Sequence, residues 1–239
     1  MIMELPLLDA EQCRAIVRQL EGLEADWTDR SLQSNRSFCT LGRASYLDVC
    51  MPDADAETAY YARLPASNAL LLAHFQPLYY QVARALSGAL AGDVVLATTL
   101  ATPGFHVFRG GGIAGAGAAG PHFDIQYDKL RLPSGTVSDE PVSFTLALEL
   151  PACGSGLDVW SIMEADFDRA FAAGRVLTLQ DLAARRICAY HPYVCGTVFL
   201  QKGLWLHRLS TPGPVAANDR RITLQGHALA IDGTWLLYW

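Results

Sequence analysis

Residues 121–124 read Pro-His-Phe-Asp, and the interpretation of the chain starts from this stretch. His122 and Asp124 are two positions apart, so on an extended strand their side chains leave from the same face. They offer one nitrogen and one carboxylate oxygen to a single metal ion. His207, within residues 203–208, is the best candidate for a third ligand. Because it lies far along the chain, the site would close only on folding.

Two histidines and one carboxylate leave open positions on one side of an octahedral ion, which is the facial arrangement of non-haem Fe(II) oxygenases. A lone His-x-Asp arises by chance in many chains, so the third ligand matters. His191, which precedes a proline, is the main rival of His207 for that position. The other histidines are not assigned to the metal, although alternation predicts that His227 faces the interior.

A second polar pair follows His207 on a predicted strand. Arg221 and Thr223 are two positions apart, so a cation and a hydroxyl share one face and can clamp a carboxylate. Arg220 is the alternative cation. Alternation places it on the opposite face with Ile222, in an apolar set facing helices or solvent, so we select Arg221.

The ordered set His122-x-Asp124, His207 and Arg221-x-Thr223 resembles the Fe(II)- and 2-oxoglutarate-dependent dioxygenases, over roughly residues 93–239. The spacing between His207 and Arg221 fits that family, whereas the spacing from His191 does not. The resemblance implies a double-stranded β-helix (jelly roll): mainly β, with N-terminal helices packed on the major sheet. It also implies Fe(II) as cofactor, with 2-oxoglutarate and O2 as cosubstrates.

By the same resemblance, Arg221 and Thr223 would hold the distal carboxylate of 2-oxoglutarate. The expected activity is that of a hydroxylase, which couples oxidative decarboxylation of 2-oxoglutarate to hydroxylation of a C–H bond. Desaturation and ring closure use the same ligands and stay open. Two alternatives are kept: a cupin-like metalloenzyme that does not use 2-oxoglutarate, and a non-catalytic jelly-roll binding protein in which His122 and Asp124 are incidental.

The chain has 239 residues, of which 51% are hydrophobic and 18% are charged, as in a compact globular protein. We predict a single domain over residues 1–239, with helices and loops in 1–92 and the jelly-roll core in 93–239. The formal net charge is −6, whereas nucleic-acid binders are usually basic. We therefore expect a small-molecule substrate and no nucleic-acid partner.

The first ten residues hold neither a basic segment nor a long apolar run, so no signal peptide is expected. No segment reaches the length of about 18 apolar residues that a membrane helix needs. The six cysteines show no Cys-x-x-Cys spacing, and we interpret them as reduced and mostly buried. These features predict a cytoplasmic protein without a membrane partner.

Hydrophobic periodicity predicts an N-terminal helix that begins after Asp9, with Gln12 completing a capping box. A second helix is predicted over residues 68–91, kinked or broken at Pro77. Short helices are expected at 164–173 and 179–186. From residue 93 the period becomes two. The predicted strands cover residues 94–102, 104–109, 122–127, 142–150, 157–162, 197–201, 204–209, 221–231 and 234–238.

Residues 110–120 read GGGIAGAGAAG, and no GK[ST] helix follows them as a phosphate loop requires. We predict a mobile connector between strands. Substrate contacts are expected at the mouth of the barrel, where Arg109, Gln126, Arg131 and Trp160 are candidates beside structural or surface roles. An arginine there would favour an anionic or amino-acid-like substrate, either free or carrier-tethered.

Overall fold

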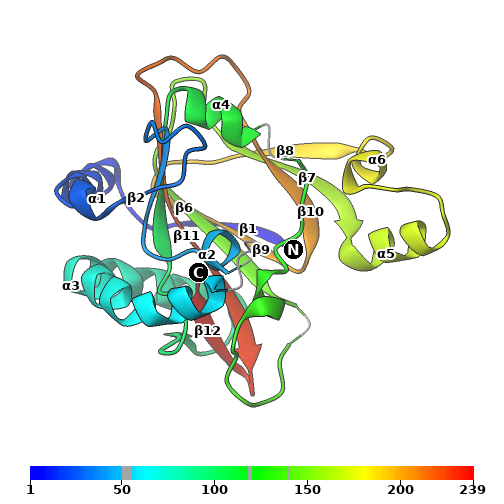
Figure 1. Ribbon diagram of the computed structural model, residues 1–239, viewed down its shortest axis with the longest axis horizontal. Helices are drawn as coiled ribbons and strands as arrows, with labels where there is room; N and C mark the ends of the chain where they lie inside the picture. The colour runs from blue at the N-terminus through cyan, green and yellow to red at the C-terminus, as the bar shows by residue number, and fades with distance from the viewer. Residues whose placement is uncertain (50–54, 118–119, 139) are drawn as a thin grey trace.

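The structure is a computed structural model that describes residues 1–49, 55–117, 120–138 and 140–239. Two β-sheets, antiparallel in all but one strand pair, lie between helices (Figure 1). The prediction of a mainly β fold with flanking helices is confirmed. None of the described helices is both long and apolar enough to cross a membrane. The assignment of residues 1–239 to one domain stays a prediction.

The larger sheet has nine strands and is organised around β11 (Arg220–Ile231), which pairs with β6 and β5 over its first half and with β12 over its second. The other strands are β1 (Ile2–Pro6), β9 (Thr197–Lys202), β6 (Val142–Glu149), β5 (Gly104–Arg109), β3 (Phe38–Leu41), β2 (Thr28–Asp29), β12 (Thr234–Tyr238) and β4 (Val94–Leu96). Strand β1 was not predicted, and it pairs along its whole length with β9.

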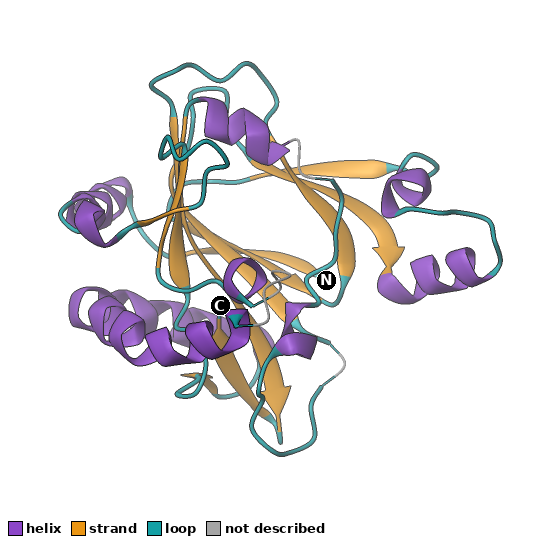
Figure 2. Ribbon diagram, in the orientation of Figure 1, coloured by secondary structure: helices purple, strands orange, loops and turns teal. Residues whose placement is uncertain are grey.

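The smaller sheet has three strands: β10 (Trp205–Ser210), β7 (Gly156–Met163) and β8 (Cys188–Pro192). It faces the larger sheet (Figure 2). Helices α5 (Glu164–Ala172) and α6 (Leu179–Ala183) lie on its outer side and are slightly shorter than predicted. Trp160 of β7 is buried in a hydrophobic cluster beneath these helices. The outer face of β7 and the two helices therefore form a second, smaller hydrophobic core.

On the opposite side, α1 (Ala10–Glu21) and α3 (Ala56–Leu90) cover the larger sheet (Figure 1). The predicted capping box is present, because Asp9 accepts from the Gln12 backbone and the Gln12 side chain accepts from the Asp9 backbone. Leu71 of α3 belongs to the hydrophobic core between the helices and the sheet and is 0% exposed. Burying such a leucine contributes about 1.5–3 kcal/mol.

Local structure differs from the predictions at three places. Helix α3 begins at Ala56, not near residue 68, and is not broken at Pro77, because the buried residues on both sides of the proline keep packing on the sheet. Residues 122–127 are not a strand: they form a single bridge at His122, followed by the 3₁₀ helix η2 (Gln126–Lys129). The glycine-rich connector contains a helix, α4 (Gly111–Gly117), in which Gly112 lies so close to the Ser37 carbonyl that no side chain would fit.

The remaining short elements are α2 (Ser45–Asp48) and the 3₁₀ helix η1 (Glu24–Asp26). Five cysteines lie within the described residues, and all are free thiols, as predicted. Cys13 and Cys39 are buried, but Cys188 and Cys195 are exposed, so the expectation that most are buried is not met. Cys50 lies outside the described residues.

Candidate metal centre

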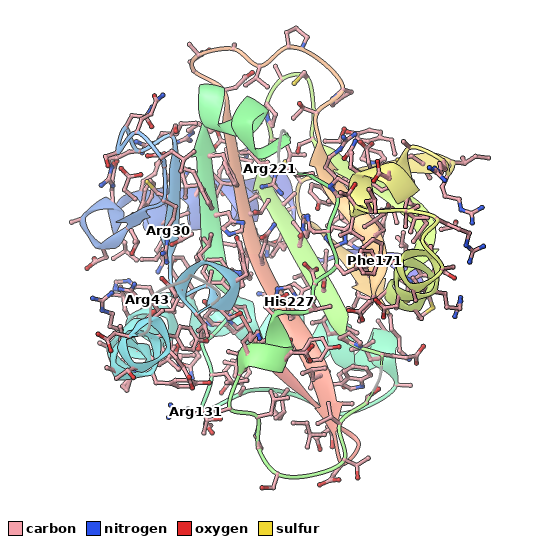
Figure 3. All side chains as sticks on the ribbon, turned by 45° about the vertical axis from the view of Figure 1, so that its right-hand side comes forward. Arg30, Arg43, Arg131, Phe171, Arg221 and His227 are labelled. Carbon is pink, nitrogen blue, oxygen red and sulfur yellow. The ribbon has the colours of Figure 1, made fainter. Side chains whose placement is uncertain are left out.

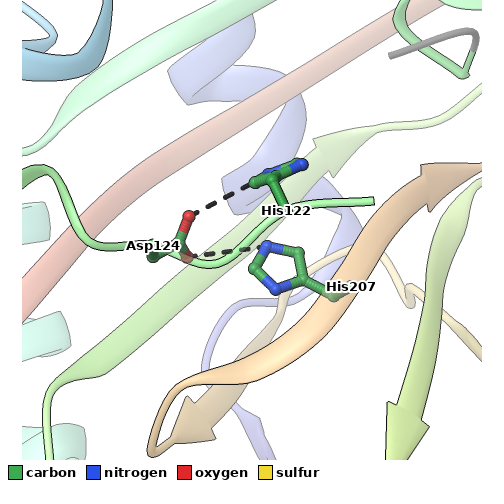
Figure 4. A group of neighbouring side chains, drawn as sticks. All are labelled: His122, Asp124 and His207. Atoms are coloured by element: carbon green, nitrogen blue, oxygen red, sulfur yellow. Dashed lines mark ion pairs between the residues drawn. The ribbon is translucent and has the colours of Figure 1, made fainter. Parts of the chain in front are cut away.

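His122, Asp124 and His207 converge at one point, although their segments are far apart in the sequence (Figure 4). One donor atom from each lies within 4.8 Å of the others. His122 Nε2 is 4.0 Å from Asp124 Oδ1, and His207 Nε2 is 3.6 Å from Asp124 Oδ2. Two backbone bonds hold the segments together: His122 N–H donates to His207 O at 2.9 Å, and His207 N–H donates to His122 O at 3.1 Å.

Both imidazole rings are oriented by backbone carbonyls. His122 Nδ1 lies 3.1 Å from Gly120 O, and His207 Nδ1 lies 2.9 Å from Trp205 O. A carbonyl only accepts, so each Nδ1 carries the proton and each Nε2 keeps its lone pair. Those lone pairs face Asp124, and this is the tautomer that a metal ligand needs.

A chain of hydrogen bonds, which we call the Asp124 relay, orients the carboxylate. Asp124 can only accept, so the Ser143 hydroxyl donates to its Oδ2 at 2.5 Å. Ser143 Oγ must then accept from His227 Nδ1–H, at 3.1 Å. His227 Nε2 is left as an acceptor, and Gln126 Nε2 donates to it at 2.6 Å. Every member is satisfied only when His227 is neutral, so the relay fixes one orientation of Asp124.

The protonation states in this cluster suit a cation. Burial by itself raises the pKa of Asp124. The positive charges that His207, His227 and His122 carry when protonated at low pH, together with the Ser143 hydroxyl, outweigh burial and lower that pKa below its ordinary value. Burial is also the main cause that lowers the pKa of His207 and of His227. A carboxylate and neutral imidazoles are the forms that bind metal.

Arg221 lies on the inner face of β11, the same face as His227, which is six residues further along the strand (Figure 3). Its side chain is 1% exposed, and its Nε has no hydrogen-bond partner. It contacts the aromatic rings of Phe108 and Tyr193, at 5.5 and 5.6 Å from their centroids. No carboxylate of the described residues lies within ion-pair distance of it.

A single cavity of about 770 Å³ connects the three converging ligands with Arg221. This volume is within the range of sites for small molecules. Its wall includes Tyr193, whose ring lies beside the Arg221 guanidinium. The geometry therefore joins a set of metal ligands at one part of the cavity to a buried, uncompensated cation at another.

No family model matches the sequence, and a search of curated proteins finds no match. Solved structures do match. An N-substituted L-amino acid dioxygenase from Burkholderia ambifaria, in complex with α-ketoglutarate (2-oxoglutarate), aligns with a TM-score of 0.58 and 14% identity, over 100% of this chain and 86% of that one. A second structure of a dioxygenase with that name gives a TM-score of 0.58 and 15% identity over the same shares of both chains.

The chain has the double-stranded β-helix fold of the 2-oxoglutarate-dependent dioxygenases. The predicted fold class is thereby confirmed. The converging residues also fit the metal that such dioxygenases use, because two oriented imidazole nitrogens and one carboxylate make up the facial donor set of Fe(II). His191, the rival third ligand, lies on β8 with its ring against Phe199 and is not part of the cluster.

The structure places three of the four candidate substrate contacts away from the cavity. Arg109 forms an ion pair with Glu24 at 2.9 Å, and Arg131 forms one with Glu57 at 2.7 Å. Trp160 is buried under α5 and α6. Gln126 does line the cavity, where it donates to His227. The expectation of arginines at the mouth is therefore not supported.

Thr223 lies on the inner face beside Arg221 as predicted, but it is 0% exposed and is not among the residues that line the cavity. Sequence analysis missed several residues of the cavity wall: Tyr46, Ser143, Thr145 and Tyr193. Alternation along β6 could have found Ser143 and Thr145. Tyr46 and Tyr193 come from irregular or short segments for which the sequence carries no periodic signal.

Proposed function

We propose that this protein is an Fe(II)- and 2-oxoglutarate-dependent oxygenase that hydroxylates a C–H bond of a small molecule. The observation that carries the proposal is the position of Arg221. A fully buried guanidinium without a carboxylate is costly, and protein sites keep such a charge where a ligand anion neutralises it. A dicarboxylate chelated at the triad would supply that anion inside the same cavity.

Each residue has one task in this proposal. His122, Asp124 and His207 would hold Fe(II), and the Asp124 relay would keep the carboxylate oriented. Arg221, with the Tyr193 hydroxyl, would bind the distal carboxylate of 2-oxoglutarate bidentately. When bound, Fe(II) with O2 supplies the oxidising power through decarboxylation of 2-oxoglutarate to succinate and carbon dioxide.

The relatedness of the fold to an N-substituted L-amino acid dioxygenase supports a small-molecule substrate. The cavity volume supports it as well. A cupin-like enzyme without 2-oxoglutarate, or a binding protein without metal, would leave the buried charge of Arg221 without a role. These alternatives are therefore less favoured than the oxygenase.

The first prediction concerns Asp124. The variant Asp124→Ala removes the oxygen ligand and the acceptor of the relay, so iron-dependent formation of succinate from 2-oxoglutarate should disappear. Succinate release is measured with purified protein, Fe(II), 2-oxoglutarate and oxygen. Asp128→Ala, which changes an exposed carboxylate nearby, is the matched control and should retain turnover. Unchanged succinate formation in Asp124→Ala would contradict the proposal.

A further inference from the structure

One wall of the cavity has no role in the proposed function. It is formed by residues 30–33, 35 and 37 of one loop and by side chains of β3, α2 and β5. Arg36 of the same loop does not line the cavity and lies 3.7 Å from Glu24. Phe38 and Phe108 stack there, with ring centroids 4.1 Å apart and an interplanar angle of 3°. Tyr46 and His106 form the polar part of the wall. We call this surface the aromatic wall.

The aromatic wall offers no free positive charge. Of the described residues that line the cavity, Arg30 and Arg221 are the arginines, and there is no lysine. Arg30 binds Asp48 bidentately at 2.7 and 2.8 Å, while its Nε donates to Thr40 Oγ1 at 3.1 Å. All three guanidinium nitrogens are therefore engaged within a pair that is 12% and 11% exposed. Releasing Asp48 would leave a carboxylate largely buried, which is costly.

Other sources of positive charge are also absent from this wall. Residues 50–54, 118–119 and 139, which the structure does not describe, contain no lysine, arginine or histidine. Arg131 points away from the cavity and pairs with Glu57 (Figure 3). Arg43 lies 3.9 Å from Asp48 and does not line the cavity. An anionic substrate would have no cation to bind.

The charges of the loaded site already balance. A ferrous ion carries two positive charges, 2-oxoglutarate two negative charges, and Asp124 and Arg221 one charge each of opposite sign. Their sum is zero. A carboxylate on the substrate would therefore add an uncompensated charge to a buried cavity, at a cost of several kcal/mol.

The polar part of the aromatic wall suits a neutral group. Tyr46 Oη lies 2.6 Å from His106 Nε2, and His106 is 4% exposed. Burial, followed by the charges of Arg221, Arg30 and His227, lowers the pKa of His106 well below its ordinary value, so its imidazole is neutral. A neutral ring can accept from Tyr46 or donate to it, which leaves the phenol oxygen free to accept from or donate to a ligand.

We propose that the substrate is an uncharged molecule whose apolar body lies against Phe38 and Phe108 and whose hydroxyl, carbonyl or amide group hydrogen-bonds to Tyr46. This inference rests on the proposed function, because it assigns Arg221 to the cosubstrate. It replaces the expectation of an anionic or amino-acid-like substrate, which depended on Arg109 and Arg131.

The test compares matched neutral and anionic probes. The pairs are N-acetyl-phenylalanine amide with N-acetyl-phenylalanine, 3-phenylpropionamide with 3-phenylpropionate, and cyclohexylmethanol with cyclohexanecarboxylate. Each is titrated without oxygen into the protein with Fe(II) and saturating 2-oxoglutarate. Binding is followed by ligand-observed NMR, and the visible charge-transfer band of iron with 2-oxoglutarate is recorded separately.

The neutral member of each pair should bind at least about tenfold more tightly, because it brings no unpaired charge into the cavity. Carboxylates that bind as well as their neutral partners would overturn the inference, and so would the failure of every neutral probe to bind. The proposed function is judged by the band alone. Binding of the neutral probes without the band would show a cavity that prefers neutral ligands and would reject the oxygenase.

Tyr46→Phe locates the binding group. Loss of one hydrogen bond should weaken the neutral probes about 3- to 10-fold while the charge-transfer band is unchanged. Phe38→Leu removes one ring of the stack and should weaken the phenyl probes more than the cyclohexyl probe. If Tyr46→Phe does not fold, Phe38→Leu still tests whether the probes bind against the aromatic wall. Unchanged affinity in a folded Tyr46→Phe variant would contradict the assignment of Tyr46.

Discussion

The two faces of strand β11 differ in whether their arginine has an acidic partner. On the outer face, Arg220 forms ion pairs with Glu149 at 2.6 Å and with Glu21 at 2.5 Å, and its side chain is 30% exposed. On the inner face, Arg221 is 1% exposed and has no carboxylate partner among the described residues. Two adjacent arginines thus differ in their surroundings: acidic neighbours neutralise Arg220, whereas Arg221 has no such neighbour among the described residues.

The difference shows how to separate structural charge from binding charge in this molecule. A charge at the rim of the fold is satisfied by acidic neighbours and contributes modestly to stability. A charge enclosed with aromatic rings and without an acidic partner destabilises the ligand-free protein and is useful only when an anion arrives. Variants on the two faces of β11 should therefore behave differently.

The largest effect is expected at Arg221. Arg221→Gln removes the charge that is proposed to pair with the distal carboxylate, so the Kd of 2-oxoglutarate should rise about 30- to 4,000-fold, equivalent to about 2–5 kcal/mol. Anaerobic titration of the charge-transfer band measures this Kd. The ligand-free variant should be at least as stable as the parent towards urea, since an unpaired buried charge is removed.

Arg220→Gln is the matched control on the other face of the strand. It should leave the Kd of 2-oxoglutarate unchanged and lower the free energy of unfolding by about 0.2–1 kcal/mol for each exposed ion pair lost. A large loss of 2-oxoglutarate affinity in Arg220→Gln, together with normal affinity in Arg221→Gln, would reverse the assignment of the two faces.

An intermediate effect is expected lower on the inner face, in the Asp124 relay. Ser143→Ala and His227→Leu both leave the Asp124 carboxylate without its oriented donor, so the Kd of Fe(II) should rise about 10- to 100-fold. His227→Asn keeps a donor near the position of Nδ1 and should recover part of the loss. Anaerobic titration with Fe(II) measures this Kd. If all three variants bind Fe(II) as tightly as the unsubstituted protein, the relay is not needed for metal binding.

The smallest effect is expected at Thr223. Its hydroxyl is buried, has no hydrogen-bond partner and does not line the cavity. Thr223→Val should therefore raise the free energy of unfolding slightly, by about 1 kcal/mol at most, and leave the Kd of 2-oxoglutarate within about threefold. A tenfold loss of 2-oxoglutarate affinity would restore Thr223 as a cosubstrate contact, as the sequence resemblance first implied.

Much of this inner face was predictable from alternation. Arg221 was selected over Arg220 on parity alone, and the structure places them on opposite faces as expected. The same rule, applied to β5, would have excluded Arg109, which pairs in register with Arg220 on the outer face. On β7, Val159 pairs with His207, so Trp160 must face the other way. Parity therefore places both residues on the faces of their strands that turn away from the cavity.

Other parts could not be predicted because they depend on contacts between distant segments. The residues after His122 do not form a strand. Asp124 still lies beside the two histidines, because two backbone hydrogen bonds join His122 to His207. Tyr46 reaches the cavity only through the packing of α2 beside β5. Strand β1 is defined by its pairing with β9, almost 200 residues away, and carries no strong period of its own.

The carbonyl groups that hold the two imidazole rings have a consequence for how this protein can evolve. Gly120 and Trp205 contribute through backbone oxygens, which every amino acid possesses. Replacing the side chain at either position leaves the hydrogen bond to the ring available. The hydrogen bonds that orient the two rings can therefore survive substitution of these neighbours, whereas Phe38, Phe108, Tyr46 and His106 act through their side chains. If the aromatic wall binds the substrate as proposed, substitutions there can change substrate preference without changing the geometry of the metal ligands.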